Sequence, residues 1–495
     1  MTGAEPLRLE PGPGRTLRDL LFERGVEFPC AGVTQCGGCK VRVLAGEVPV
    51  TDEMRAVLSP EELQSGWRLG CMAEADGPVT LEIAQWSVQI LDDHARLPFE
   101  PSEGFGAVVD LGTTTLVAQL VDRSTGAVAE VETALNVQGR FGADLMSRIR
   151  HDLERPGELC RLIREQIGAM LMRLAGGRPL QEVLLVGNTA MHHLVCGLSV
   201  EPLAAVPFRS PFLEARFLEA RELGWSVALE RPACFLPCIG GFVGSDLLAG
   251  LVATGLNDSA EPGALLDLGT NGEIAVGDRA GIHCASTAAG PAFEGGRIGR
   301  GMRASAGAID RVSVVDGSLE CGVIGGGPPR GLCGSGLVDA AAAALELGWI
   351  APSGRMTGGR KSVPLSGEVS LTQADIRELQ LAKGAVAAGL ELLLAGRRFP
   401  GSRVFLAGAF GNYVRGQSAR RIGLLPSWAG HPTAAGNSAL RGTRMLLLAP
   451  SRREAVLRSL LGATTHIELA ADPQFQDAFV GHMRFPDAEE LCPGS

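Results

Sequence analysis

The chain has 495 residues, of which 45% are hydrophobic and 20% are charged, and its formal net charge is −10. This length and composition are typical of a globular protein of two to four domains with sizeable cores. The negative charge argues against a protein whose main task is to hold nucleic acid or an anionic membrane. It leaves ATP binding open, because a local cluster of groups handles the charge of a nucleotide.

No export or membrane signal is evident. Residues 1–14 are polar and rich in Pro and Gly, and no apolar run reaches the roughly 18 residues that span a bilayer. We therefore expect a cytoplasmic protein. Its 12 cysteines should then be thiols or metal ligands rather than disulfides.

Residues 1–86 are expected to form the first domain, with a helix over 16–28 and strands over 40–44 and 79–83. Four cysteines stand out within it. Five residues separate Cys30 from Cys36, two separate Cys36 from Cys39, and Cys71 follows about thirty residues later. Thiolates bind iron as soft ligands, and the glycines between them let a loop wrap a cluster. The spacing predicts a [2Fe–2S] site.

A structural zinc site is the alternative, but zinc sites usually take two close cysteine couples, which Cys30 and Cys71 do not provide. The pattern resembles plant- and vertebrate-type ferredoxins, which have a β-grasp fold, and its first gap of five residues is that of the vertebrate type. Clusters of this class carry one electron at low potential, on the order of −400 mV for the plant type. The remaining cysteines are expected to be buried thiols; they are Cys160, Cys196, Cys234, Cys238, Cys284, Cys321, Cys333 and Cys492.

Residues 87–104 contain prolines and charges and predict a linker that lets the first domain move. Beyond it, an apolar run, an aspartate and a glycine turn with hydroxyls occur at residues 109–116 and again at 266–273. We interpret each copy as the first hairpin of one lobe, with a first lobe over 105–260 and a second over 261–495.

The two turns have the composition of a phosphate site. Glycine turns present backbone N–H groups and hydroxyls to phosphate oxygens. Two aspartates, Asp110 and Asp267, can hold Mg²⁺ through its waters, since that ion keeps several and takes few carboxylates. The turn residues expected to contact phosphate are Gly112, Thr113, Thr114, Thr115, Gly269, Thr270, Asn271, Gly272 and Glu273.

Three acidic residues are candidates for orienting an attacking water: Asp144, Asp246 and Glu273. Each has a plainer interpretation, because Asp144 and Asp246 stand where helix caps occur and Glu273 suits a solvated strand. His192 and His193, at the start of a helix, are expected to be structural.

Strands and helices alternate through both lobes, which predicts a duplicated α/β fold. A surface insertion is expected over 200–225 and a closing strand over 467–469. Helices are expected over 144–153, 158–174, 247–254, 337–347, 373–395 and 437–448. Further strands are expected over 106–111, 115–121, 182–186, 233–238, 265–276 (a hairpin), 282–284 and 403–406.

This order resembles the acetate and sugar kinase, Hsc70 and actin superfamily, whose two ribonuclease H-like lobes close on ATP and Mg²⁺. The resemblance places connecting helices at residues 240–251 and 437–448. It also places an adenosine loop at 408–412, with Gly408, Ala409 and Gly411 as contacts.

The whole chain resembles the reductive activators of corrinoid proteins, in which a ferredoxin domain precedes this ATPase fold. The resemblance implies ATP-dependent, one-electron reduction of cobalt(II) to cobalt(I) in a corrinoid protein of a methyltransferase system. It also implies an external reductase as electron donor and a homodimer, with no nucleic acid or membrane partner.

Three other functions remain open. The chain could be a small-molecule kinase with a regulatory ferredoxin, or an activator of a 2-hydroxyacyl-CoA dehydratase. It could also be a redox protein with a degenerate nucleotide fold, which the intact Asp110 and Asp267 disfavour.

Overall fold

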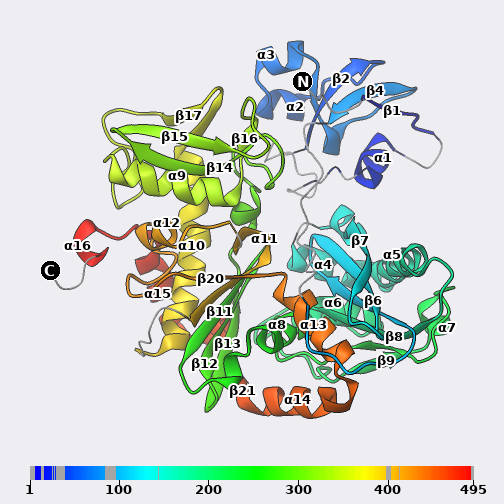
Figure 1. Ribbon diagram of the computed structural model, residues 1–495. Helices are drawn as coiled ribbons and strands as arrows, with labels where there is room; N and C mark the ends of the chain where they lie inside the picture. Colours follow the sequence, from blue (N-terminus) through cyan, green and yellow to red (C-terminus); the bar gives the residue numbers. More distant parts are fainter. Residues whose placement is uncertain are drawn as a thin grey trace. The chain divides into compact units, whose positions relative to one another are not determined.

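The computed structural model describes residues 6–12, 16–24, 26, 28, 39–83, 96–142, 144–396, 403–411 and 413–491. The chain divides into two compact units. One unit comprises Met1–Gln89 with Gly290–Ala382, and the other comprises Ile90–Ala289 with Lys383–Ser495. In Figure 1 the chain runs from blue at the N-terminus to red at the C-terminus.

The N-terminal part of the first unit is a four-stranded sheet in the order β1-β4-β2-β3. The strands are β1 (Leu7–Leu9), β2 (Lys40–Ala45), β3 (Trp67–Leu69) and β4 (Val79–Ile83). The helices are α1 (Leu17–Glu23), α2 (Asp52–Val57), α3 (Pro60–Gln64) and the 3₁₀ turn η1 (Gly70–Met72).

Helix α1 is shorter than expected. It begins after Thr16, which forms a capping box with Asp19, and it ends at Glu23. The last turn is closed by the N–H groups of Arg24 and Val26, which donate to Leu20 O at 3.2 Å and to Leu21 O at 2.9 Å. Val26 still enters the same core, so its apolar character was correctly noticed but belongs to the segment beyond the helix.

Residues from the second lobe complete the first unit. Three strands form one small sheet, in the order β15-β14-β16, and two form another. These strands are β14 (Ala308–Val315), β15 (Ser318–Val323), β16 (Gly331–Leu332), β17 (Ser362–Ser366) and β18 (Val369–Thr372). The helices of this part are η5 (Pro291–Glu294), α9 (Gly334–Glu346) and the start of α10 (Gln373–Leu394).

The second unit holds two six-stranded sheets, ordered β7-β6-β5-β8-β10-β9 and β20-β19-β11-β12-β13-β21. In each sheet the first three strands in chain order form an antiparallel meander, and two later strands continue in parallel from the first. The shared topology confirms the predicted duplication.

The strands of the first lobe are β5 (Phe105–Leu111), β6 (Thr115–Asp122), β7 (Val128–Leu135), β8 (Leu180–Gly187), β9 (Arg216–Leu218) and β10 (Ala233–Phe235). Its helices are η2 (Val137–Arg140), α4 (Leu145–Glu154), α5 (Glu158–Ala175), α6 (Thr189–Cys196), η3 (Glu201–Leu203), α7 (Ala220–Leu223), α8 (Ser245–Thr254) and η4 (Leu256–Asp258).

In the second lobe the strands of this unit are β11 (Gly263–Leu268), β12 (Gly272–Asp278), β13 (Gly281–Thr287), β19 (Val404–Ala407), β20 (Thr433–Gly436) and β21 (Thr464–His466). The helices are the end of α10, then α11 (Gly408–Gly411), α12 (Gly416–Arg421), α13 (Ser438–Leu448), α14 (Pro450–Ala463), η7 (Leu469–Ala471), α15 (Pro473–Met483) and α16 (Ala488–Leu491).

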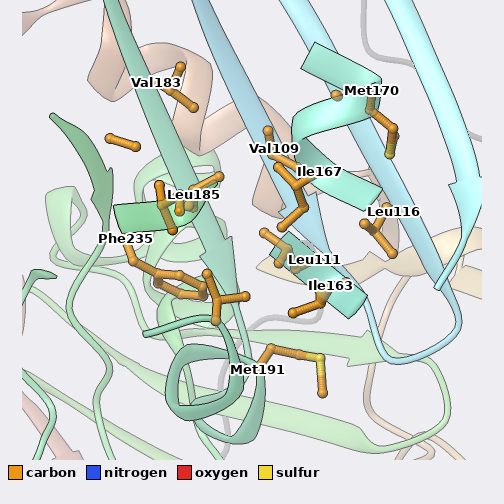
Figure 2. Packing of buried hydrophobic residues seen from close by; sticks show 14 of the residues in the cluster. Val109, Leu111, Leu116, Ile163, Ile167, Met170, Val183, Leu185, Met191 and Phe235 are labelled. Carbon is orange, nitrogen blue, oxygen red and sulfur yellow. The ribbon is translucent and has the colours of Figure 1, made fainter. Parts of the chain in front are cut away.

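The core of the first lobe lies between its sheet and helices α5 and α6 (Figure 2). Leu111 and Leu116, which flank the first glycine turn, are fully buried in it. Ile163 and Ile167 from α5 pack against them. Burial of such side chains stabilises the fold by about 1.5–3 kcal/mol each. The turn between β5 and β6 is therefore held on a rigid base.

The two predicted connecting helices, α8 and α13, lie side by side (Figure 1). A Cβ atom on Gly442 would lie 1.8 Å from the carbonyl oxygen of Ala249, so only glycine permits this crossing. The close approach joins the two lobes directly behind their glycine turns.

Two expectations need correction. The predicted linker is partly packed. Leu97 and Phe99 pack against an apolar cluster formed by residues of both lobes, and Glu100 accepts hydrogen bonds from Ser451. The predicted closing strand lies earlier, at β21, and helices follow it. Residues 84–95 of the chain lie outside the described part.

Candidate functional site

The two glycine turns meet through their hydroxyl groups. Thr114 Oγ1 lies 3.2 Å from Thr270 Oγ1. In the first turn, Gly112 donates its N–H to Thr115 O at 3.0 Å, and a Cβ on Gly112 would lie 2.6 Å from that oxygen. In the second turn, Gly269 donates to Asn271 O at 3.0 Å. Both turns are thus tight, and they come together as the sequence repeat predicted.

Four carboxyl groups gather at these turns. Asp110 and Asp267 are the penultimate residues of β5 and β11, and Glu273 pairs with Asp267 across the β11–β12 ladder. Asp246 lies in the first turn of α8. These groups are close enough to repel one another: Asp110 raises the pKa of Asp246 and of Asp267, and Asp246 and Asp267 raise that of Glu273. The structure therefore assembles four of the five predicted acidic residues.

Burial dominates the electrostatics of this cluster. Desolvation, opposed by a hydrogen bond from Asn437, raises the pKa of Asp110 to about 6. Desolvation and neighbouring carboxylates raise the pKa of Asp246 and of Asp267 to about 7. The same two causes hold the pKa of Glu273 well above its usual range. None of the described groups that shift these pKa values is a cation. Among the described residues, no three acidic, histidine or cysteine side chains are placed to ligate one metal ion directly.

Asn437 links the first turn to the second connecting helix. Its Nδ2 donates to Asp110 Oδ2 at 2.9 Å, while its Oδ1 caps α13 by accepting from Leu440 N at 2.8 Å. The sequence predicted the helix start but not this contact, which joins residues 327 positions apart. The one feature of the sequence that could have indicated this contact is the amide side chain at the start of the last connecting helix.

Asp144 is not part of the acidic cluster, which corrects its prediction as a catalytic residue. It is exposed, and it caps α4 by accepting from Ser147 N at 2.8 Å. Ser147 donates its hydroxyl to Asp144 Oδ1 as well. Capping boxes and catalytic acids share residue types, so the sequence alone could not separate the two roles.

The predicted adenosine loop lies against the second turn. Its backbone forms the single-turn helix α11, and Gly408 has φ +82°. A Cβ there would lie 2.8 Å from Leu268 O and 3.0 Å from Asp267 Oδ1. Gly411 is buried in the same turn, whereas the side chain of Ala409 and all of Asn412 lie outside the described part.

The histidine pair has structural contacts. His193 Nδ1 lies 2.6 Å from Ser199 O and its Nε2 lies 2.7 Å from Ser210 Oγ. His192 is fully buried and packs edge-on against Phe235, with ring centroids 4.9 Å apart. These contacts agree with the expected structural role.

Half of the predicted cysteine site lies in the described part. Cys39 and Cys71 are buried, and Cys71 N–H donates to Cys39 Sγ at 3.4 Å. Backbone N–H groups directed at sulfur are typical of iron–sulfur sites, so these two residues fit the group. Cys30 and Cys36 lie outside the described residues.

Four of the other cysteines, Cys234, Cys238, Cys284 and Cys333, are buried thiols, as expected, whereas Cys160, Cys196 and Cys321 are only half-buried. Burial raises the pKa of the Cys196, Cys234 and Cys284 thiols to about 12 and that of Cys238 further still. Cys492 lies outside the described residues. Thiols held neutral in this way are inert.

Two lobes of one topology, with glycine turns that meet and half-buried acidic residues beside them, define a nucleotide-binding protein of the acetate and sugar kinase, Hsc70 and actin (ASKHA) class. A ferredoxin-like module precedes these lobes. Residues 4–76 match the 2Fe-2S iron-sulfur cluster binding domain, and residues 105–259 match the RACo middle region. Residues 261–494 match the C-terminal domain of RACo, the ASKHA domain. The chain belongs to the RACo family, the reductive activators of corrinoid proteins.

Individual relatives agree with this assignment. The corrinoid activation enzyme RamQ of Eubacterium limosum is 34% identical over 77% of this chain and 70% of its own. The [Co(II) methylated amine-specific corrinoid protein] reductase of Methanosarcina barkeri is 29% identical over 77% of each chain. A solved reductive activator for corrinoid, iron-sulfur protein superposes with a TM-score of 0.71 at 26% identity, covering 99% of this chain and 100% of its own.

Proposed function

We propose that this chain reduces inactive cobalt(II) in a partner corrinoid protein to cobalt(I), and that ATP bound between its glycine turns drives the transfer. The observation that carries the proposal is the half-buried cluster of Asp110, Asp246, Asp267 and Glu273, whose pKa values are all raised, in a chain that also carries the ferredoxin-like cysteine site. The names of the two relatives above supply the substrate class.

Within the nucleotide site, each group has a distinct task. The N–H groups and hydroxyls of the two turns bind the phosphate chain. Asp110 and Asp267 hold the waters of Mg²⁺. Asp246 and Glu273 are then left to orient the attacking water. The pKa of Asp246, raised to about 7, suits proton acceptance near neutral pH.

In the cysteine site, Cys30, Cys36, Cys39 and Cys71 are the proposed ligands. A [2Fe–2S] group bound there supplies one electron at a time at low potential. The two ligands within the described part of the chain, Cys39 and Cys71, are buried. An external reductase and assembly as a homodimer complete the proposal.

ATP is needed because the electron moves uphill. For one electron, each 59 mV uphill costs a factor of ten, or about 1.4 kcal/mol. A nucleotide that bridges the two turns holds the lobes together, and this closure changes how the chain meets its partner. Membership in the corrinoid-activator family disfavours the kinase, dehydratase-activator and redox-sensor alternatives.

Two variants separate the halves of this mechanism. Cys36→Ser should abolish cobalt reduction and leave ATP binding unchanged. Asp110→Ala should abolish ATP hydrolysis and leave the visible spectrum of the iron–sulfur site unchanged. Cobalt reduction at the wild-type rate by either variant would overturn the proposed function.

A further inference from the structure

The first glycine turn is held from behind by three hydrogen bonds to its carbonyl groups. Asn136 donates its Nδ2 to Gly112 O at 3.0 Å and its backbone N–H to Thr114 O at 2.9 Å. Between these two bonds, Arg148 donates its Nη2 to Thr113 O. Every carbonyl of the Gly112-Thr113-Thr114 segment is therefore occupied on one side of the turn.

Peptide geometry converts this restraint into an anion site. In a trans peptide unit the carbonyl and the following N–H point in opposite directions. Donors that fix the carbonyls of Gly112 and Thr113 therefore turn the N–H groups of Thr113 and Thr114 the other way. Among the described residues, neither of these two N–H groups donates to a protein acceptor. Both are thus available to a phosphate oxygen.

Arg148 is an unusual side chain for such a task. It projects from α4, is 1% exposed, and also donates its Nε to Gly142 O at 2.9 Å. Its Nη1 is buried without a partner in the described structure. Its described hydrogen bonds all go to carbonyl oxygens, and the one carboxylate that favours its charge, Asp144, is itself exposed. A buried guanidinium with so little compensation is costly, which argues that its charge serves the neighbouring turn.

We propose that Arg148 and Asn136 are positioning residues that hold the first turn in its phosphate-binding form, and that the Arg148 charge favours the anion bound there. The inference rests on the proposed function, because it takes the phosphate chain of ATP as the ligand. Neither residue touches the nucleotide; both act through the backbone of residues 112–114.

The test measures binding of ATP and of adenosine by calorimetry to the full chain and to Arg148→Met. We expect a 10- to 100-fold loss of ATP affinity and no change in adenosine affinity, because only the phosphates meet the turn. Arg148→Lys, which keeps the charge and one donor, should restore part of the loss. Arg150→Met is the matched control, since Arg150 is exposed on the same helix.

A second measurement uses only the wild-type chain, in case Arg148→Met does not fold. ATP should slow hydrogen exchange in a peptide that spans residues 112–116, and adenosine should not. Wild-type ATP affinity in Arg148→Met, an equal loss of adenosine affinity, or unchanged exchange on ATP binding would each overturn the inference alone. Failure of the wild-type chain to bind ATP would overturn the proposed function with it.

Discussion

Thr114 Oγ1 and Thr270 Oγ1 lie 3.2 Å apart and join turns separated by 156 positions in the chain. The two hydroxyls meet at the point where the phosphate chain of ATP is proposed to bind. The relationship ties the duplication visible in the sequence to one place in the structure, and it leads to the first prediction.

Loss of either hydroxyl should weaken nucleotide binding. Thr114→Val or Thr270→Val keeps the shape of the side chain and removes one hydrogen-bonding group, which is worth about 0.5–1.5 kcal/mol. We expect ATP affinity measured by calorimetry to fall about 3- to 10-fold in each. Thr133→Val, on the exposed edge strand β7, is the control. Unchanged affinity in both site variants would contradict the assignment of the turns.

Removal of one buried charge should stabilise the protein while it destroys activity. The pKa of Asp267 is about 7 in the fold against an ordinary value of 3.8. The folded protein therefore holds this proton to higher pH than the unfolded chain, and stability falls as pH rises from about 4 to about 7. Asp267→Asn should raise the free energy of unfolding by about 1–3 kcal/mol at pH 8, with a smaller gain at pH 5.5.

Urea denaturation at the two pH values measures this gain, and an ATPase assay should record loss of hydrolysis in the same variant. Asp144→Asn is the matched control, because asparagine caps helices as well as aspartate does. If Asp267→Asn instead lowered the free energy of unfolding, and lowered it more at pH 8 than at pH 5.5, the Asp267 carboxylate would be stabilised in the fold and the prediction would be wrong.

Metal binding should release protons. Asp110, Asp246 and Asp267, with pKa values of about 6 to 7, are partly protonated at pH 6.5. Mg²⁺ favours the ionised forms, so its affinity in the presence of ATP should rise between pH 6 and pH 8. Calorimetry in two buffers of different ionisation enthalpy counts the protons. A proton count of zero at pH 6.5 would contradict the shifted pKa values.

The side-chain amide of Asn437 should contribute to ATP hydrolysis as well as capping helix α13. Asn437→Asp keeps an oxygen that can cap α13 but replaces the donor to Asp110 with a negative charge. We expect the rate of ATP hydrolysis to fall about 10- to 100-fold, which corresponds to an increase of roughly 1.4–2.7 kcal/mol in the activation free energy. Thermal unfolding should change little. Asn437→Ala removes both contacts, so it should lower stability by about 1 kcal/mol as well. Normal hydrolysis in Asn437→Asp would assign Asn437 to the helix alone.

The sequence predicted the parts of this protein that depend on local pattern. Alternating apolar residues and glycine turns gave the hairpins β5–β6 and β11–β12, and their repetition gave the two lobes. The C-terminal region was harder. Helix α15 has no buried residue, so its periodicity is weak, and residues 467–469 looked more like a strand than the polar β21 did.

The repeat predicted that the two turns meet, but the sequence could not predict the contacts that Asn437 and Arg148 make with the first turn and its aspartate. Asn437 reaches Asp110, and Arg148 reaches the carbonyl of Thr113, only after the two lobes and α4 have packed. Composition and spacing record which groups a site has available. The fold alone decides that Asp246 joins the acidic cluster and that Asp144 caps a helix.

The most direct test of the account is a single-turnover reduction of a cobalt(II) corrinoid protein, followed by its visible spectrum, with the wild-type chain reduced beforehand. The account predicts that the cobalt(I) spectrum develops with Mg²⁺ and ATP and does not develop without nucleotide. The Asp110→Ala variant should give no cobalt(I) spectrum even with ATP present, as the wild-type chain does when ATP is left out. Equal rates of cobalt(I) formation with and without ATP would contradict the central claim.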